Sequence, residues 1–452
     1  MIALDFYIFA SHFINIHLLL MTNFTEKTKY RLQSMSTGRM FDDTGWILDD
    51  DQSDKPTLIR AIYDKKQIDI KSDDFGFYKF ADWLPVVKYL KGSSAPVTYK
   101  SEGFAKHLGL ENLYITFSGY WPEIGALMPT CSFKETEAYS VCARLVAKTD
   151  KILVVASAGN TARAFARVCS DNDIPLLLCV PEEMVDVLWF DEPIKSCVKL
   201  VVSAKGSDYY DAIHLSNLAC EIDKFVMEGG AKNVARRDGM GTTVLSAASV
   251  IGKIPDYYFQ AVGSGTGAIA AWEANLRLIG DGRFGNNKMK LMVSQNEPFM
   301  PLFHAWNKRS RELGIHDHNE AREQVAQIDA KVLSNRKPPY GLVGGLFDAL
   351  ADTNGEVLTV SNIKGREAAK LFLELEGNDL HPAAAIAAAS LIDAVNNNNV
   401  EKDAVIMLNV TGGGEEKFKH EKQLHYLKPE MVFDIDPDIE DVKKRLKNLF
   451  HG

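Results

Sequence analysis

Short runs of branched apolar residues recur from residue 150 onward, separated by longer stretches whose apolar positions fall on one face. Such runs suit strands that are buried on both sides, and the intervening stretches suit helices. Strands spaced by helices predict parallel sheets built from β-α-β units, and therefore an α/β fold. The predicted strands cover residues 151–155, 175–180, 199–202, 224–226, 257–262, 290–294 and 404–408, and the predicted helices cover 161–170, 209–221, 242–251 and 268–279.

The rest of the chain is less regular. A predicted strand at 113–117 and a turn-rich segment lead into a helical run from Glu135 to about Ala147. The sequence Asp238-Gly239 indicates a turn before helix 242–251. The remaining predictions are a hairpin-like ribbon at 30–51, a docking segment at 81–86, a turn and a helix at 97–110, and a charged tail at 429–452 that ends in a helix.

Composition narrows the class of protein. Of the 452 residues, 46% are hydrophobic and 25% are charged, which is ordinary for a soluble globular protein of about two domains. The net charge of −9 includes no long block of one sign, so we do not expect a nucleic-acid partner. Six cysteines without a C-x-x-C pair indicate reduced thiols in a cytoplasmic protein rather than a disulfide framework.

Residues 1–20 are rich in apolar side chains, but Asp5, His12 and His17 interrupt the run. No Lys or Arg precedes Lys27, so the basic region of a signal peptide is missing. The segment is also too polar for a convincing membrane helix. We therefore expect an extension that is unstructured or precedes a true start at Met21, rather than a targeting segment, and we expect no membrane partner.

Lys134 is the first candidate for chemistry. It ends the string Pro-Thr-Cys-Ser-Phe-Lys, at the predicted start of the helix that begins near Glu135. The helix dipole and partial burial both lower the pKa of an amine there and favour its neutral, nucleophilic form. Such a lysine suits a Schiff base with a carbonyl cofactor, and the alternative is an exposed first-turn lysine. The nearby Cys131 has no evident histidine partner and is expected to be a packing residue.

Two glycine-bearing turns follow predicted strands, where ligands gather in open α/β sheets. The string Ala-Ser-Ala-Gly-Asn-Thr at 156–161 places Asn160, a donor and an acceptor, at a helix start. The string Gly-Ser-Gly-Thr-Gly-Ala at 263–268 lets the backbone approach a phosphate. The second string also matches the dinucleotide fingerprint, which would make the protein an NAD-dependent oxidoreductase with Glu297 near the ribose. Each string can also be a plain turn.

A third turn follows the predicted strand at 404–408. Thr411 lies there, and its hydroxyl can hydrogen-bond a heterocycle nitrogen or simply serve the turn. His381 precedes Pro382 at the start of an alanine-rich helix. We expect His381 to be a helix-entry residue rather than a base, although it can line the same cleft.

Four of these strings occur together in the order typical of one enzyme family. Ser132–Lys134, Ser157–Asn160, the turn at 263–267 and Thr411–Gly412 resemble the fold type II pyridoxal-phosphate family, the group of threonine synthase and the tryptophan synthase β-subunit. The resemblance covers roughly residues 80 to 415. Within this family, segments 119–123, 131–135, 160–165 and 233–239 are most similar to the cysteate synthases.

The resemblance implies a fold, a cofactor and residue roles. Two open, twisted parallel-sheet domains would hold pyridoxal 5'-phosphate in the cleft between them. Lys134 would form the Schiff base, Asn160 would contact the 3-hydroxyl oxygen of the cofactor, and Thr411 would face its pyridine nitrogen. The cofactor phosphate would bind at Gly263, Gly265, Thr266 and Gly267.

The expected domain division follows the same resemblance. The large cofactor domain would comprise 76–133 and 252–430, and the smaller α/β domain would comprise 134–251. Residues 1–75 would form the extension and a small ribbon, and 431–452 a tail helix. Some relatives carry cysteines in this ribbon, but Ser34 and Thr37 occupy the first pair of positions here, so no metal is expected.

The implied reaction is β-replacement on O-phospho-L-serine by sulfite, which gives L-cysteate and phosphate. Both reactants are anions, so local cations must attract them to a protein of net negative charge. Arg163, Arg236 and Arg237 are the candidates, because an arginine fork matches phosphate or sulfite oxygens; a surface ion pair is the alternative for each.

Two related reactions stay open. One is threonine synthesis from O-phosphohomoserine and water, and the other is β-replacement with another nucleophile such as sulfide. Threonine synthases usually read Ser-Phe-Lys-Asp-Arg, whereas Glu135 and Thr136 follow Lys134 here, which puts threonine synthesis in doubt. The expected partners are small anionic substrates and further copies of the chain in a homo-oligomer.

Overall fold

The computed structural model describes residues 27–145, 150–157, 159–315 and 317–450. The extension expected at 1–20 lies outside this range. Across the described residues, none of the helices combines the length and the apolar character needed to cross a membrane. The same residues include no cluster of His, Cys, Asp and Glu that could hold a metal ion, and all six cysteines are free thiols.

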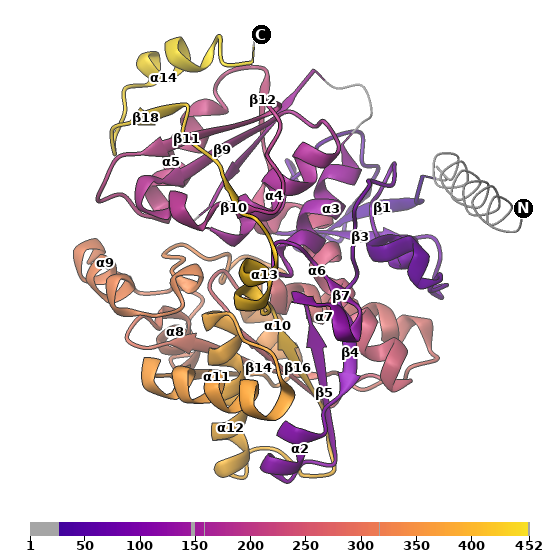
Figure 1. Cartoon of the computed structure of the whole chain (residues 1–452). Helices are drawn as coiled ribbons and strands as arrows, with labels where there is room; N and C mark the ends of the chain where they lie inside the picture. The colour runs from indigo at the N-terminus through magenta and orange to yellow at the C-terminus, as the bar shows by residue number, and fades with distance from the viewer. Residues whose placement is uncertain (1–26, 146–149, 158, 316, 451–452) are drawn as a thin grey trace, which may run out of the picture.

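Two sheets organise the chain, one in the upper and one in the lower half of Figure 1. The upper sheet has the order β12-β8-β9-β11-β18, and the lower sheet has the order β15-β14-β13-β16-β5-β4. All neighbouring strands are parallel except β4 and β5. The upper strands are β8 (Ile152–Ala156), β9 (Leu176–Pro181), β11 (Val198–Ser203), β12 (Phe225–Met227) and β18 (Met431–Phe433). The lower strands are β4 (Val97–Lys100), β5 (Asn112–Phe117), β13 (Tyr257–Ala261), β14 (Lys290–Asn296), β15 (Glu356–Val360) and β16 (Val405–Val410).

The central strands confirm the predicted α/β fold. Every residue of β9 and of β16 is buried, as expected for parallel strands that are covered on both faces. The helices that flank the sheets are α4 (Asn160–Asp171), α5 (Tyr209–Ala219), α11 (Asn362–Glu376), α12 (Pro382–Asn396) and α14 (Ile439–Leu446).

A stack of three helices joins the two halves. These are α3 (Lys134–Arg144), α6 (Val234–Ile251) and α7 (Thr266–Asp281). The predicted turn at Asp238-Gly239 is wrong, because α6 runs through it without a break. A Cβ added at Gly239 would overlap the carbonyl oxygen of Thr136 in α3. This glycine therefore allows close helix packing, which outweighs its low helix propensity.

Strand pairing explains two further differences from the sequence prediction. Val97–Lys100 forms β4 at the edge of the lower sheet, and only α2 (Gly103–Leu108) of the predicted 97–110 unit is helical. The tail contributes β18, which pairs with β11, as well as α14. The partner of β4 lies beyond α2, and the partner of β18 lies in a much earlier part of the chain, so no local pattern marks either strand.

The N-terminal ribbon is a three-stranded sheet of β1 (Tyr30–Ser34), β2 (Met40–Phe41) and β3 (Ile59–Tyr63). The hairpin-like pairing of β1 and β2 agrees with the predicted ribbon, whereas β3 was not predicted. Buried polar contacts attach β3 to the helix stack. Tyr63 donates to Asp238 of α6 at 2.6 Å, and Arg60 lies 3.1 Å from Glu273 of α7.

Replacing Gly239 tests the role of this close packing. Gly239→Ala should lower the free energy of unfolding by about 1–3 kcal/mol, because the added methyl group forces α6 away from α3. Gly280→Ala in α7 is the control, since its Cβ would meet nothing within 4 Å. It should stabilise the protein by about 0.5–1 kcal/mol through helix propensity. Urea unfolding measures the free energy of unfolding of both variants. A Gly239→Ala value equal to or above that of wild type would contradict the packing role.

Candidate active site

One small cavity of about 70 Å³ is lined by every residue to which the sequence assigned cofactor contact. They come from four separate places in the fold. Lys134 begins α3, Asn160 begins α4, the turn at 263–267 follows β13, and Thr411 follows β16. The structure therefore brings together residues that are almost 280 positions apart, counting 411 − 134 = 277 from Lys134 to Thr411.

Backbone hydrogen bonds fix the spacing between Lys134 and Thr411. The Phe133 N–H donates to the Thr411 carbonyl at 3.0 Å, and the Gly413 N–H donates to the Cys131 carbonyl at 3.2 Å. Cys131 has a φ of 52°, so the chain turns sharply just before the lysine. Its side chain is buried with Tyr120, Trp189 and Phe418, and burial raises the pKa of the thiol. These contacts agree with a packing residue.

The glycine turn at 263–267 is tightly enclosed. A Cβ at Gly263 would lie 2.9 Å from the Cα of Leu333, and a Cβ at Gly267 would lie 2.5 Å from Nε2 of Gln260. Gly265 has a φ of 76°, which an L side chain rarely adopts. The turn leads into α7, whose first N–H groups have no acceptor within the helix. An anion of modest size suits this end of the cavity.

Lys134 lies in a charged but buried setting. Its side chain is 20% exposed, and its Nζ is 3.2 Å from Oε2 of Glu137, one turn further along α3. Burial lowers the pKa of Lys134, while the Glu137 carboxylate acts in the opposite direction. The predicted position at a helix start is confirmed, and the alternative of an exposed lysine is wrong.

Arg163 holds the surroundings of Asn160 in place. Its guanidinium donates to Oδ1 of Asn160 at 3.2 Å, to the Thr130 carbonyl at 2.9 Å and to the Val187 carbonyl at 3.0 Å. It also stacks on Trp189, with its Cζ 3.9 Å from the ring centroid. Arg163 is thus occupied by protein partners. It does not line the cavities described here, so the structure gives no support for a direct substrate contact.

His381 lies on the other side of Asn160. Its Nε2 is 3.3 Å from Nδ2 of Asn160, and burial lowers the pKa of the imidazole to about 4. His381 is therefore neutral near pH 7. It stands immediately before α12, as the sequence predicted for a helix-entry residue, and it also lines the small cavity.

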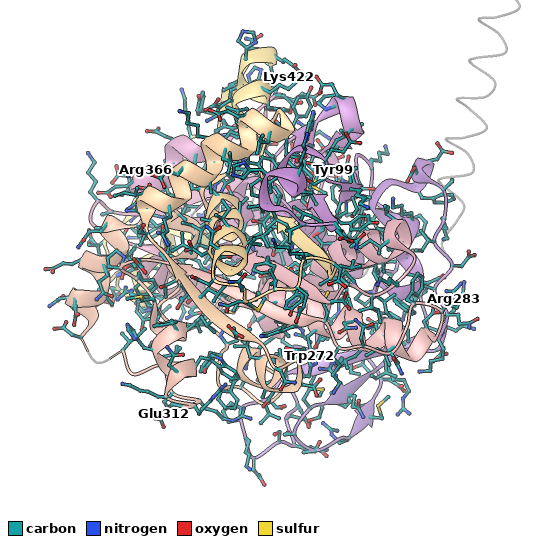
Figure 2. All side chains as sticks on the ribbon, turned by 90° about the horizontal axis from the view of Figure 1, so that it is seen from below. Tyr99, Trp272, Arg283, Glu312, Arg366 and Lys422 are labelled. Atoms are coloured by element: carbon teal, nitrogen blue, oxygen red, sulfur yellow. The ribbon has the colours of Figure 1, made fainter. Side chains whose placement is uncertain are left out.

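A larger chamber of about 900 Å³ adjoins the small cavity. Lys134, Asn160, Ser264, Thr266 and Val332 line both spaces. The cationic residues of the chamber are Lys55, Lys134, Lys232, Arg236, Arg311 and Lys337, whereas Glu312 is its one acidic residue. Glu312 is exposed and lies at the rim of the molecule in Figure 2. The chamber is thus strongly cationic in a protein of net charge −9.

Arg236 and Arg237 have different surroundings. Arg236 lines the chamber, but its two arms contact Glu137 at 3.0 Å and Glu228 at 2.9 Å. Arg237 points away from the chamber and donates to Glu273 and to the carbonyl oxygens of Ala231 and Ile59. It anchors the ribbon strand β3. Because both arginines lie in helix α6, their side chains point in different directions. The sequence prediction placed them before a turn and therefore treated them as a pair.

Sequence reasoning missed several residues of the site. Gln260 is a polar residue in an apolar strand, a signal that could have identified it. Val332 and Leu333 close over the glycine turn, and Lys55 reaches the chamber from the ribbon. These three have no local signal, because only the tertiary fold carries them to the site.

Comparison with known proteins shows which enzymes this chain resembles. Residues 101–412 match the family described as pyridoxal-phosphate dependent enzyme. The cysteate synthase of Methanosarcina barkeri is 47% identical over 84% of this chain and 92% of its own length. The cysteate synthase of Methanosarcina acetivorans is 46% identical over 86% of this chain and 93% of its own length. Maize serine racemase shares the fold, with a TM-score of 0.55 and 14% identity over 72% of this chain and 93% of that one.

The residues of the small cavity fit pyridoxal phosphate. The group needs an amine for its carbonyl carbon and an anion site for its phosphate. Lys134 offers the amine, and the enclosed glycine turn at the start of α7 offers the anion site. Asn160 and Thr411 supply polar contacts between these ends.

An Arg163 variant tests whether this side chain orients Asn160. Arg163→Met keeps an apolar stem but removes every donor, so Asn160 and the Thr130 loop lose their anchor. Pyridoxal phosphate should then bind about 10- to 100-fold more weakly in equilibrium titration, since a hydrogen bond to a charged group contributes roughly 1.5–3 kcal/mol. Arg167→Met is the matched control, because Arg167 pairs with Asp171 one turn away and does not contact Asn160. Equal affinity in both variants would contradict the orienting role.

Proposed function

Because this chain belongs to the family of pyridoxal-phosphate-dependent enzymes, we propose that it converts O-phospho-L-serine and sulfite to L-cysteate and phosphate. The cofactor is pyridoxal 5'-phosphate. In this β-replacement the bond between the β-carbon and the phosphate oxygen breaks, and phosphate leaves with the electron pair. Sulfite then supplies the electron pair of the new carbon–sulfur bond.

The cationic chamber carries this proposal. Phosphoserine and sulfite are both multiply charged anions, and the chamber next to Lys134 is lined by Lys55, Lys232, Arg311 and Lys337. A cleft lined by one sign of charge concentrates ligands of the opposite sign. The similarity to cysteate synthases supports the same substrates.

Two of these cations are suited to bind an incoming anion. Among the described residues, neither Lys55 nor Lys337 has a carboxylate within ion-pair distance, although Lys337 contacts the Tyr210 hydroxyl at 3.0 Å. By contrast, Lys232 pairs with Asp49 and Arg311 pairs with Asp348. Lys55 and Lys337 can therefore offer their full charge to phosphate or sulfite. Arg236 lines the same chamber but is already neutralised by buried carboxylates.

The site residues divide the work of the reaction. When bound, the cofactor supplies an electron sink that acidifies the α-proton of the amino acid. Lys134, as a neutral amine, accepts that proton. The glycine turn would hold the cofactor phosphate, Asn160 would contact the 3-hydroxyl oxygen of the cofactor, and Thr411 would offer a neutral hydroxyl to its ring nitrogen. A neutral partner there limits charge delocalisation into the ring, which favours elimination over transamination.

Product identification tests the reaction directly. Purified enzyme should form cysteate only when both phosphoserine and sulfite are present, as measured by mass spectrometry. Phosphohomoserine, alone and with sulfite, and phosphoserine with sulfide are the comparison reactions. Threonine from phosphohomoserine without cysteate from phosphoserine and sulfite would refute the proposal, and cysteine formed in preference to cysteate would reassign the nucleophile to sulfide.

Removing the charge of Lys55 or Lys337 tests whether these lysines bind the anionic substrates. Lys55→Gln and Lys337→Gln should each raise the KM of phosphoserine or of sulfite about tenfold, while kcat stays within about twofold, because anion capture is weakened and the chemistry is not. Lys253→Gln is the control, since it removes the same charge from an exposed position outside the chamber. Steady-state kinetics with each substrate varied in turn gives the comparison. Unchanged KM values in both chamber variants would contradict anion capture by these lysines.

A further inference from the structure

Lys134 belongs to a cluster of four charged side chains, whose other members are Glu137, Arg236 and Glu228. Glu137 lies 3.2 Å from Lys134 through Oε2 and 3.0 Å from Arg236 through Oε1. Arg236 in turn lies 2.9 Å from Oε1 of Glu228. Oε2 of Glu228 accepts the Gly230 N–H at 3.0 Å. The cluster therefore links α3, α6 and the segment after β12 behind the reactive lysine.

The cluster is isolated from water on the Glu137 side. The Glu137 side chain is fully buried, and the Arg236 and Glu228 side chains are 9% and 6% exposed. The groups that face Lys134 are Glu137 from its own helix, Arg236 from α6 and Glu228 from the segment after β12. Tyr209 of α5 is half-buried and lies close to Arg236. Among the described residues, Glu137 is the one carboxylate within ion-pair distance of Lys134.

Charge balance in the cluster depends on the state of Lys134. With a protonated lysine, two cations face two carboxylates and the cluster is neutral. A neutral lysine leaves one surplus negative charge in a buried position, which is costly unless a carboxylate binds a proton. Because Glu137 is the nearest carboxylate, a proton that leaves Lys134 has an acceptor 3.2 Å away.

We propose that Glu137 exchanges a proton with Lys134. It is a positioning residue, because it acts on the reaction only through the lysine. The Glu137 carboxylate takes a proton from the Lys134 ammonium when the amine must be neutral, and it returns that proton afterwards. One N–H bond breaks and one O–H bond forms, with no change of oxidation state. This inference requires Lys134 to act as the base of the proposed reaction, but it does not depend on which nucleophile the enzyme uses.

The test follows the charge state of Lys134 without any substrate. The full-length chain, freed of pyridoxal phosphate, is labelled with an amine-reactive acylating reagent over a range of pH, and Lys134 labelling is quantified by peptide mass spectrometry. The Glu137 carboxylate raises the pKa of Lys134 against the effect of burial. Glu137→Gln should therefore move the labelling midpoint at least one unit lower, which gives about tenfold faster labelling at a fixed pH below the midpoint.

Turnover should change in the opposite direction. In the holoenzyme, Glu137→Gln should lower kcat by about 10- to 100-fold because the buried proton acceptor is lost. The acid limb of the kcat profile should move to lower pH together with the labelling midpoint. A purely structural role would not make the lysine more reactive while it slows the enzyme. Glu135→Gln is the matched control on the same helix, because its carboxylate binds the Thr130 N–H and hydroxyl at 2.7 Å instead of Lys134.

Two outcomes would overturn the inference. One is a Glu137→Gln labelling midpoint equal to those of wild type and Glu135→Gln, and the other is an unchanged kcat. If Glu137→Gln does not fold, Glu137→Asp applies the same test, since it keeps the charge but moves the carboxylate away from Lys134. Its midpoint should fall below that of wild type, and an unchanged midpoint would reject the proposal. If the midpoint shifts in Glu137→Gln but the wild-type enzyme forms no cysteate from phosphoserine and sulfite, only the proposed reaction is rejected.

Discussion

The backbone pairing of residues 131–133 with 411–413 is the constraint on which the rest of the site depends. It attaches the start of α3 to the end of β16, and so holds Lys134 against the lower sheet. Main-chain hydrogen bonds of this kind do not rely on side-chain rotamers. Asn160, the glycine turn and the chamber wall are then arranged around a fixed Lys134. The positive φ of Cys131 belongs to this constraint, because the chain must reverse before the helix begins.

Electrostatics acts at two depths in this site. Near the chamber, Lys55 and Lys337 face solvent-accessible space, where salt screens their attraction for anions. Behind Lys134, the buried charges of Glu137, Arg236 and Glu228 are screened much less. Under the proposed function, the outer charges would favour ligand capture, whereas the inner charges act on the pKa of Lys134. The net negative charge of the whole chain conceals this local arrangement.

Much of the fold and the cavity could be predicted from the sequence because the signals are local. A strand, a glycine-bearing turn and a helix start occupy about ten consecutive residues, so Asn160, Gly265 and Thr411 could be found without knowledge of the tertiary structure. The predicted sheets follow from the same local patterns. Whether these residues contact the cofactor as assigned, whether the chain divides into the expected domains and whether it forms a homo-oligomer stay predictions.

The failures of sequence reasoning have a common physical cause. Gly239 looked like a turn residue because glycine favours turns locally, but the neighbouring helix α3 requires a residue without a side chain at that point. Arg163 and Arg237 looked like anion binders because nothing in the sequence shows which carbonyl oxygens will surround a guanidinium. Strands β3, β4 and β18 depend on pairing partners that do not adjoin them in the sequence.

The N-terminal ribbon contributes to the wall of the chamber. Thr57 forms a bridge with Val343, and the Leu58 N–H donates to the Val343 carbonyl at 2.9 Å, so Lys55 and Pro56 are held in the chamber wall. This small module encloses part of the space where the proposed substrates would bind. The wall of the chamber therefore extends beyond the two sheets and includes part of the ribbon. A fragment trimmed to the part that matches the family would keep the cofactor cavity but lose one side of the chamber.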